Sequence, residues 1–270
     1  MKIRFTKAHG ARNDFLLSWA HDVPQGDVAE MAKAICDRYT GVGADGWMLV
    51  WPPEPGTDVD GRIRLYNSDG SDSEISGNGT RCAAAFLLAN GTDKREVRIA
   101  TGAGVKHLQV NAADGQRFHF RMNMGKPKLV EGGLHFLLPF RSGTQEVTIL
   151  DVGNPQCVVM VDDFEFDWRA MGRELEFHPH FPNRTNVSFV RPVSEDSIEV
   201  RFWERGAGET QSSGTGSSGA AAAAILRGLV KSPVAVQTVG GILPIWWDGA
   251  GDLFLEGPAV IIAAGEFFLS

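Results

Sequence analysis

The segment SGNGTRCAAAF (Ser76–Phe86) returns in similar form as SGTGSSGAAAA (Ser213–Ala223). The segments before them also align without a gap, because RLYNSDGSDSEIS (Arg64–Ser76) and RFWERGAGETQSS (Arg201–Ser213) keep a constant offset of half the chain. A repeat this long exceeds the roughly 20–50 residues of a solenoid unit. It therefore predicts two similar domains.

Each copy predicts the same local structure: a short alternating strand, a loop rich in small polar residues, a Gly-x-Gly turn and an Ala-rich helix. The turn glycines are Gly77, Gly79, Gly214 and Gly216. A helix start with open backbone N–H groups and the positive end of the helix dipole suits an anion. One such turn would equally serve tight packing of a core helix, but two in register favour an anion site.

The remaining pattern predicts a mixed α/β chain. A helix is expected over Asp27–Arg38, with Asp27 as its N-cap. Polar residues at Asn111–Gln116 suggest the domain junction. Strands are expected at Ile63–Tyr66 and Glu199–Trp203 in the repeats, and at Trp47–Trp51, Glu96–Ala100, Arg117–Met122, Val147–Asp151, Cys157–Val161 and Ile261–Ala264.

Composition excludes several classes of protein. The 270 residues are 43% hydrophobic and 22% charged, which is typical of a globular protein. The net charge of −7 and the lack of a basic run argue against nucleic acid as a partner. No signal-peptide pattern and no apolar window of about 18 residues occurs, so we expect a cytoplasmic protein without a membrane partner.

Three other features predict no site. Cys36, Cys82 and Cys157 are widely spaced, which indicates buried reduced thiols and neither disulfides nor zinc ligands. His178 and His180 lack a third ligand at a suitable spacing, and two surface histidines are the simpler interpretation. The GVGADG motif (41–46) lies after a helix and before a strand, the reverse of a dinucleotide-binding order.

The loop ERGAGET (Glu204–Thr210) places opposite charges beside glycines, directly before the second Gly-x-Gly turn. An arginine there can bind a carboxylate through two hydrogen bonds, and Glu204 can receive an ammonium group. A solvated ion pair is the alternative. Asn67, Asn154 and Asn186 are each expected in a polar loop (YNSDG, GNPQ and RTNVS) and could equally be ordinary turn residues.

These residues carry a resemblance to the diaminopimelate epimerase family. The matching stretches span most of the chain: KAHGARNDF (Lys7–Phe15), CDRYTGVGADG (Cys36–Gly46), YNSDGSDSEISGNGTRC (Tyr66–Cys82), GNPQCVV (Gly153–Val159), TNVSFV (Thr185–Val190) and ERGAGETQSSGTGS (Glu204–Ser217). The resemblance implies an α/β (α+β) fold of two pseudo-symmetric domains, each a mainly antiparallel sheet around a central helix, with the active site in the cleft between them. The domains would be residues 1–113 plus 258–270, and 114–257.

The resemblance also implies a homodimer and a cofactor-independent isomerase, using neither pyridoxal phosphate nor metal, that interconverts LL- and meso-diaminopimelate. One group removes the α-proton and a second returns a proton on the opposite face. The α-carboxylate would lie on Gly77-Asn78 and Gly214-Thr215. By the same resemblance the distal end of the substrate would be bound by Arg205, with Asn13, Asn67, Asn154, Asn186 and Glu204 around it.

Ser76 and Ser213 occupy the positions of the family's two catalytic cysteines. A thiol titrates near 8.5 and an alcohol near the ~15.7 of water, a difference of about seven units or roughly 10 kcal/mol. Helix dipoles offer about 2 kcal/mol at best, and no histidine is spaced to activate either serine. We therefore expect substrate binding with little or no turnover. Gln156 also departs from the family, which usually has histidine after GNP.

Three hypotheses follow. The favoured one is an epimerase of lysine and peptidoglycan precursors in a form without its thiols, because the residues for the distal group are present. The second is a catalytically silent binding protein for a dicarboxylic amino acid, in which the serines are native. The third is a relative of the phenazine-biosynthesis or proline-racemase type, which Arg205, Asn67 and Asn186 disfavour because those substrates lack a second amino-acid group.

Overall fold

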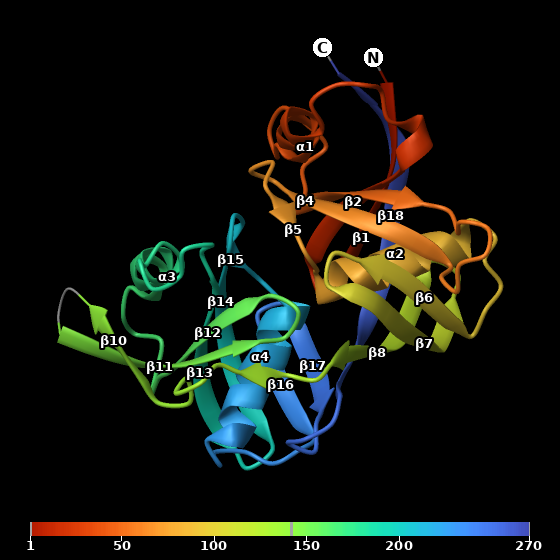
Figure 1. Cartoon of the computed structure of the whole chain (residues 1–270). Coiled ribbons are helices and arrows are strands. Elements are labelled where there is room, and N and C mark those ends of the chain that lie inside the picture. Colours follow the sequence, from red (N-terminus) through yellow and green to blue (C-terminus); the bar gives the residue numbers. More distant parts are fainter. Residues whose placement is uncertain (1, 141–142, 270) are drawn as a thin grey trace. The chain divides into compact units, whose positions relative to one another are not determined.

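The chain folds into two compact units. The computed structural model describes residues 2–140 and 143–269. One unit is Met1–Asn123 together with Glu256–Ser270, and the other is Met124–Leu255 (Figure 1). The chain therefore crosses between them after Asn123 and after Leu255. Residues 111–116, where the sequence suggested a junction, form the end of one strand and the turn to the next within the first unit.

The first unit is a mainly antiparallel sheet with two α-helices. Its elements are β1 (Lys2–Gly10), β2 (Asn13–Trp19), the 3-10 helix η1 (Ala20–Asp22), α1 (Val28–Cys36), β3 (Gly46–Trp51), β4 (Gly61–Asn67), β5 (Asp72–Ser73), α2 (Gly77–Ala89), β6 (Glu96–Thr101), β7 (Gly104–Asp114), β8 (Arg117–Gly125) and the last part of β18 (Leu253–Phe268). β2 pairs with β3, and β4 with β6, in parallel. β18 returns antiparallel to β1, with Lys2 opposite Phe268.

The second unit repeats this plan. Its elements are β9 (Lys128–Leu129), β10 (Phe136–Phe140), β11 (Gly143–Asp151), β12 (Pro155–Met160), α3 (Trp168–Glu176), β13 (Asn186–Ser194), β14 (Ser197–Glu204), β15 (Gly208–Thr210), α4 (Gly214–Leu226), β16 (Val234–Thr238) and β17 (Gly241–Trp246). Here the parallel pairs are β12 with β13 and β14 with β16. In each of the four parallel pairs, one α-helix lies in the chain between the two strands: α1 and α2 in the first unit, and α3 and α4 in the second. The two similar folds that the repeat predicted are confirmed.

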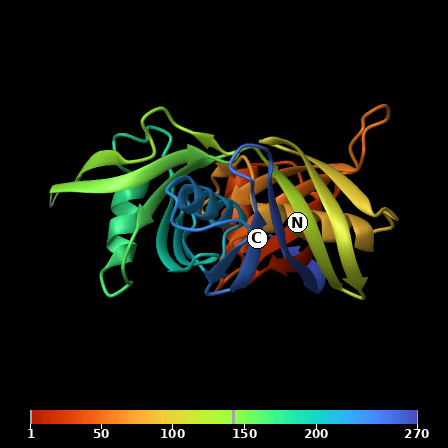
Figure 2. The same cartoon turned by 90° about the horizontal axis from the view of Figure 1, so that it is seen from below.

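The helices α2 and α4 are the centres of the two units. Residues 77–87 of α2 and 214–224 of α4 are all buried. Strands of its own unit contact each helix on several sides (Figures 1 and 2). Small residues predominate along both helices, because a close-packed interior leaves little room for larger side chains where the strands approach the helix. The Ala-rich composition is therefore explained by burial.

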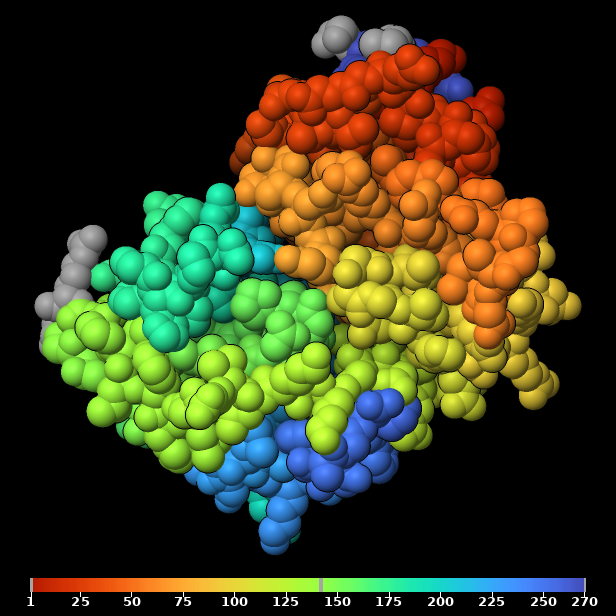
Figure 3. All heavy atoms as spheres, in the orientation of Figure 1, coloured from red at the N-terminus to blue at the C-terminus, as the bar shows by residue number. Residues whose placement is uncertain are grey.

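The other two helices cover the opposite faces of the strands. In the first unit, residues of α1 pack with Leu16, Trp47 and Leu49 in one apolar cluster. Met48, the neighbour of Trp47, instead approaches Gly79 of α2, because successive strand residues point to opposite faces. In the second unit α3 packs on β13 and β14 in the same manner. Figure 3 shows that α3 and the residues after it lie at the surface of that unit.

Most elements predicted from the sequence are confirmed. Asp27 is the N-cap of α1 and accepts from the amides of Ala29 and Glu30, at 3.0 and 3.3 Å. The helix ends at Cys36, two residues before the predicted end, because the Asp37 backbone is extended (φ −58°, ψ 128°). All eight predicted strands lie within or largely within observed ones. The three cysteines are buried and free.

The first turns of α2 and α4 tolerate a methyl group differently. A Cβ at Gly216 would lie 2.8 Å from two atoms of the Phe202 ring, whereas one at Gly79 would meet the terminal methyl of Met48 at 2.7 Å. A buried ring cannot give way, but the end of a Met side chain can rotate. We expect Gly216→Ala to lower the free energy of unfolding by about 1–3 kcal/mol and Gly79→Ala to lower it by less.

Urea denaturation of both variants measures this difference, and because both replace the third residue of a buried helix, helix propensity changes equally. A larger loss for Gly79→Ala than for Gly216→Ala would contradict the packing described here.

Candidate functional site

Ser76 caps the helix α2. Its extended backbone (φ −127°, ψ 123°) lets the hydroxyl oxygen accept a hydrogen bond from the Gly79 amide at 3.1 Å. Serine is favoured at this position because it satisfies an amide that has no partner within the helix. Ser76 is half-buried, while Gly77 and Asn78 are buried. The structure thus places all three at the positive end of a helix dipole.

A relay of side-chain amides supports Asn78. Its Nδ2 donates to Asn13 Oδ1 at 3.1 Å, and Asn13 Nδ2 donates to Asp45 Oδ2 at 2.6 Å. The guanidinium of Arg81 donates to Asn78 Oδ1. Because each amide has one donor group and one acceptor oxygen, these bonds fix the orientation of both. The relay runs from a cation to a carboxylate through Asn78 and Asn13.

Arg81 is a fully buried cation beneath the first turn of α2. It also donates to the carbonyls of Gly77 and Pro258, at 3.3 and 3.2 Å. Burial lowers its pKa to about 10, so it remains charged at neutral pH. Arg81 is not among the site residues predicted from the sequence, although a single charged residue in a helix of small and apolar residues was a usable signal.

Charged residues fix the other end of the relay. Asp14 receives Arg38 Nη2 at 2.8 Å and Lys7 Nζ at 3.1 Å, and Arg38 Nη2 also lies 2.7 Å from Asp45 Oδ1. Burial opposes ionisation of Asp14, but the hydrogen bonds from Arg38 and Lys7 outweigh it and lower its pKa. Burial and the nearby charge of Asp14 raise the pKa of Asp45. This cluster holds the carboxylate that binds Asn13.

Ser213 caps α4 in the same geometry (φ −133°, ψ 126°), accepting from the Gly216 amide at 3.0 Å. Unlike Ser76, its hydroxyl also donates to a carboxylate, Glu204 Oε2, at 2.6 Å. Thr210 Oγ1 donates to the second oxygen of Glu204, also at 2.6 Å. The structure therefore places Glu204 against residue 213, whereas the family resemblance led us to expect it near the distal ammonium group.

Asn154 and Gln156 lie beside the first turn of α4. Asn154 Nδ2 donates to Thr215 Oγ1 at 3.3 Å, and Gln156 Nε2 donates to Asn154 Oδ1 at 2.7 Å. Gln156 is fully buried and approaches α4 at Gly219. Its Oε1 has no hydrogen-bond partner among the described residues. Gln156 thus orients Asn154.

Asn186 holds the loop that carries Arg205. Its Oδ1 accepts from the Arg205 amide at 3.1 Å, and its Nδ2 donates to the Pro155 carbonyl at 3.0 Å. Arg205 Nη1 donates to the Asn183 carbonyl at 3.2 Å. Asn186 is buried as the first residue of β13, so it is a strand residue and the expectation of a loop position is wrong.

Most of the predicted site residues are thus hydrogen-bonded to another predicted site residue of the same unit. They join Asn13 to Asn78 in the first unit, and Asn154 to Thr215, Glu204 to Ser213 and Asn186 to Arg205 in the second. Asn67, the last residue of β4, instead donates to the hydroxyl of Ser71 at 3.0 Å. Gly77 and Gly214 begin the two helices.

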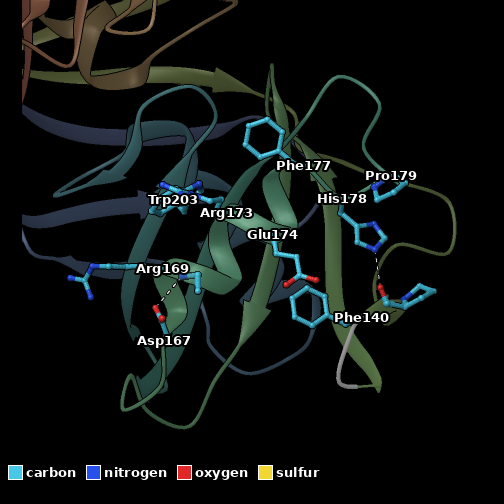
Figure 4. Close-up of a pocket in the computed structure, with 11 residues that line it drawn as sticks. Phe140, Asp167, Arg169, Arg173, Glu174, Phe177, His178, Pro179 and Trp203 are labelled. Atoms are coloured by element: carbon cyan, nitrogen blue, oxygen red, sulfur yellow. Dashed lines mark hydrogen bonds between the residues drawn. The ribbon is translucent and has the colours of Figure 1, made fainter.

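Other parts of the described chain offer less chemistry. A surface pocket of about 1020 Å³ lies beside α3, and its lining includes none of the predicted site residues (Figure 4). His178 Nε2 lies 2.8 Å from the Pro139 carbonyl, and His180 is exposed. Within residues 2–140 and 143–269, no group of three metal-ligating side chains occurs and no helix is long and apolar enough to cross a membrane.

The fold is that of solved isomerase structures. One is a hydroxyproline epimerase from Agrobacterium vitis, with a TM-score of 0.74 and 17% identity, covering 98% of this chain and 92% of that one. Another is a PhzF-family phenazine biosynthesis protein from Bacillus anthracis, with a TM-score of 0.71 and 15% identity over the full length of both. Identities this low establish the fold alone.

Sequence similarity is much higher to one family. The sequence profile described as diaminopimelate epimerase matches residues 5–130 and 148–262. Proteins of that name are 42% identical in Azoarcus sp., over 100% of both chains, and 36% identical in Halothermothrix orenii, over 100% of this chain and 99% of the relative. The chain belongs to the diaminopimelate epimerase family.

The three cysteines of this chain are buried and weakly acidic. Burial raises the pKa of Cys36, Cys82 and Cys157 to about 12. Because the thiolate is the reactive form, each thiol is about 10⁻⁴ ionised at pH 8. We expect no alkylation by iodoacetamide at pH 8 in the folded chain, and three modified sites in guanidinium chloride, both read by intact mass. Rapid labelling of the folded chain would contradict the burial of these thiols.

Proposed function

We propose that this chain is a diaminopimelate epimerase scaffold whose acid/base positions, 76 and 213, carry serine and therefore give little or no turnover. The reaction type is the cofactor-independent inversion of one α-carbon between the LL and meso forms. The observation that carries the proposal is family membership over the full length, with 36% to 42% identity to the relatives described above. The relatives' name supplies the substrate.

The site residues extend the proposal. Each unit would contribute one acid/base position, and the substrate α-carboxylate would bind the amides at Gly77-Asn78 and Gly214-Thr215. Two buried helix starts support this assignment, because the positive ends of their dipoles stabilise a carboxylate and the charge that develops on proton removal. The buried charge of Arg81 adds to the positive potential at the start of α2.

The distal amino-acid group would be bound by Arg205, together with Asn13, Asn67, Asn154, Asn186 and Glu204. Support is uneven. The rigid attachment of Arg205 and the two-sided bonding of Asn186 favour a preorganised arginine that binds a carboxylate. Glu204 has a second possible role, since its carboxylate already contacts the side chain at position 213.

A carboxylate next to Ser213 does not make the serine an effective base. Transfer of its proton to a carboxylate with a pKa near 4 is opposed by about eleven units, given an alcohol near 15.7. The serines instead serve as helix caps, and this role explains why serine at both positions is compatible with a folded chain. This observation favours the second candidate function, a silent binding protein for a dicarboxylic amino acid.

Solvent deuterium uptake at the α-carbons of diaminopimelate, followed by proton NMR, distinguishes the epimerase scaffold from the silent binding protein. We compare the chain as it stands with a Ser76→Cys/Ser213→Cys variant and with each single variant. The epimerase proposal expects exchange and LL-to-meso interconversion in the double variant, at least 10³-fold faster than in the parent chain. If diaminopimelate binds but the folded double variant exchanges no deuterium, the epimerase proposal is wrong.

The same substitutions test the capping role. Sulfur is a weak acceptor, so each Ser→Cys change weakens the bond from the third helix amide. We expect a loss of about 0.5–2 kcal/mol in the free energy of unfolding per site. The loss is expected to be larger at 213, where the hydroxyl is buried and also donates to Glu204. Urea denaturation of the single variants measures both, and a gain in stability would contradict the role.

We further propose, from the family resemblance, a homodimer located in the cytoplasm. Sedimentation velocity across a concentration series tests the homodimer, because a chain that stays monomeric at all concentrations would refute dimer formation.

A further inference from the structure

Glu176, the last residue of α3, is a buried carboxylate outside the proposed substrate contacts. Only 3% of its surface is exposed. A negative charge at a helix C-terminus is disfavoured by the helix dipole, and burial of an ionised group adds a further cost. Its neighbours must therefore compensate, and they do so through the segment that carries Arg205.

The Glu176 carboxylate accepts hydrogen bonds from residues on either side of Glu204 and Arg205 in the chain. Gly206 N donates to Glu176 Oε1 at 3.0 Å, and the indole Nε1 of Trp203 donates to Oε2 at 2.8 Å. Trp203 and Gly206 flank Glu204 and Arg205 in the chain. Since Asn186 Oδ1 holds the Arg205 amide, two successive amides of this loop are bound by two different buried side chains.

A second connection runs to the Arg205 guanidinium. Arg184 Nη1 lies 3.5 Å from Glu176 Oε1, and Arg184 itself has a left-handed backbone (φ 59°). The preceding carbonyl, that of Asn183, accepts from Arg205 Nη1 at 3.2 Å. Glu176 thus attaches the turn that orients the Arg205 side chain as well as the loop that carries its backbone.

The helix α3 cannot shift easily relative to Trp203. A Cβ at Gly172 would lie 2.7 Å from Trp203 Cβ, so the helix backbone packs directly on the residue. The guanidinium of the next residue, Arg173, lies 5.6 Å from the centre of the Trp203 ring (Figure 4). This packing gives Glu176 a fixed support.

We propose that Glu176 is a positioning residue for Arg205, and that it sets how tightly the distal carboxylate of the substrate is held. The inference rests on the proposed function, in which Arg205 binds that carboxylate. Glu176→Gln keeps the size of the side chain but replaces one acceptor oxygen by a donor, so that either Trp203 or Gly206 loses its acceptor.

The attachment is tested without substrate by hydrogen exchange and mass spectrometry. In Glu176→Gln we expect faster amide exchange in peptides covering residues 203–210 and 183–185. The matched control is Glu174→Gln, two residues earlier on the same helix and half-buried, which is expected to leave exchange unchanged. Trp203→Phe, which removes one donor, serves as a second test if Glu176→Gln does not fold. Unchanged exchange in the folded Glu176→Gln or Trp203→Phe chain would overturn the positioning role.

The effect on binding is tested by calorimetry with meso-diaminopimelate and with L-lysine, which lacks the distal carboxylate. Glu176→Gln is expected to weaken diaminopimelate binding about five- to tenfold and to leave lysine binding unchanged. Equal weakening of both ligands, or of neither, would refute a specific role for Glu176. If the unaltered chain does not prefer diaminopimelate to lysine, the role proposed for Arg205 fails, while the exchange data still decide the attachment.

Discussion

The hydrogen bond from a helix amide to the side-chain oxygen at residue 76 or 213 is the constraint around which each unit is built. Both helices that begin there are buried over eleven residues, so water cannot satisfy the backbone groups of their first turns. A side chain must do so, and the strand and loop before each helix deliver it in an extended conformation. Small residues along the helix then let the strands close around it.

The side-chain atom that caps the helix at residue 76 or 213 is also the atom proposed to act in acid/base chemistry. The two roles favour different chemical groups. A serine oxygen is a good acceptor for a helix amide, but the hydroxyl does not ionise near neutral pH, whereas a thiol is a weak acceptor that ionises near pH 8.5. The chain has a serine oxygen at both helix caps, and its three cysteines lie elsewhere in the core. Hydrogen bonds hold side chains beside both serines, including those of the Asn13–Asn78 relay and of the Glu204–Thr210 pair. Nothing in the local packing requires a thiol.

Local patterns were sufficient to predict much of the fold. The repeat, the Ala-rich helices, the Asp27 cap and the alternating strands all depend on neighbours in sequence, and the structure has them. The helix α3 was missed because DWRAMGRELE (Asp167–Glu176) is short and mostly polar, although Trp168, Met171 and Leu175 recur at helical spacing after the Asp167 N-cap. Asp45, Arg81 and Glu176 were missed as supporting residues, because each acts on a partner far away in the sequence or through a backbone amide.

The two serines have unequal electrostatic surroundings, although the folds around them are similar. Residue 213 contacts the carboxylate of Glu204, while the start of α2 lies above the buried cation Arg81, which donates to the Gly77 carbonyl. A negative neighbour disfavours an anion and a positive one favours it. An acidic group at position 213 would therefore hold its proton more tightly than the same group at position 76. Two similar folds thus give their helix caps different acidities.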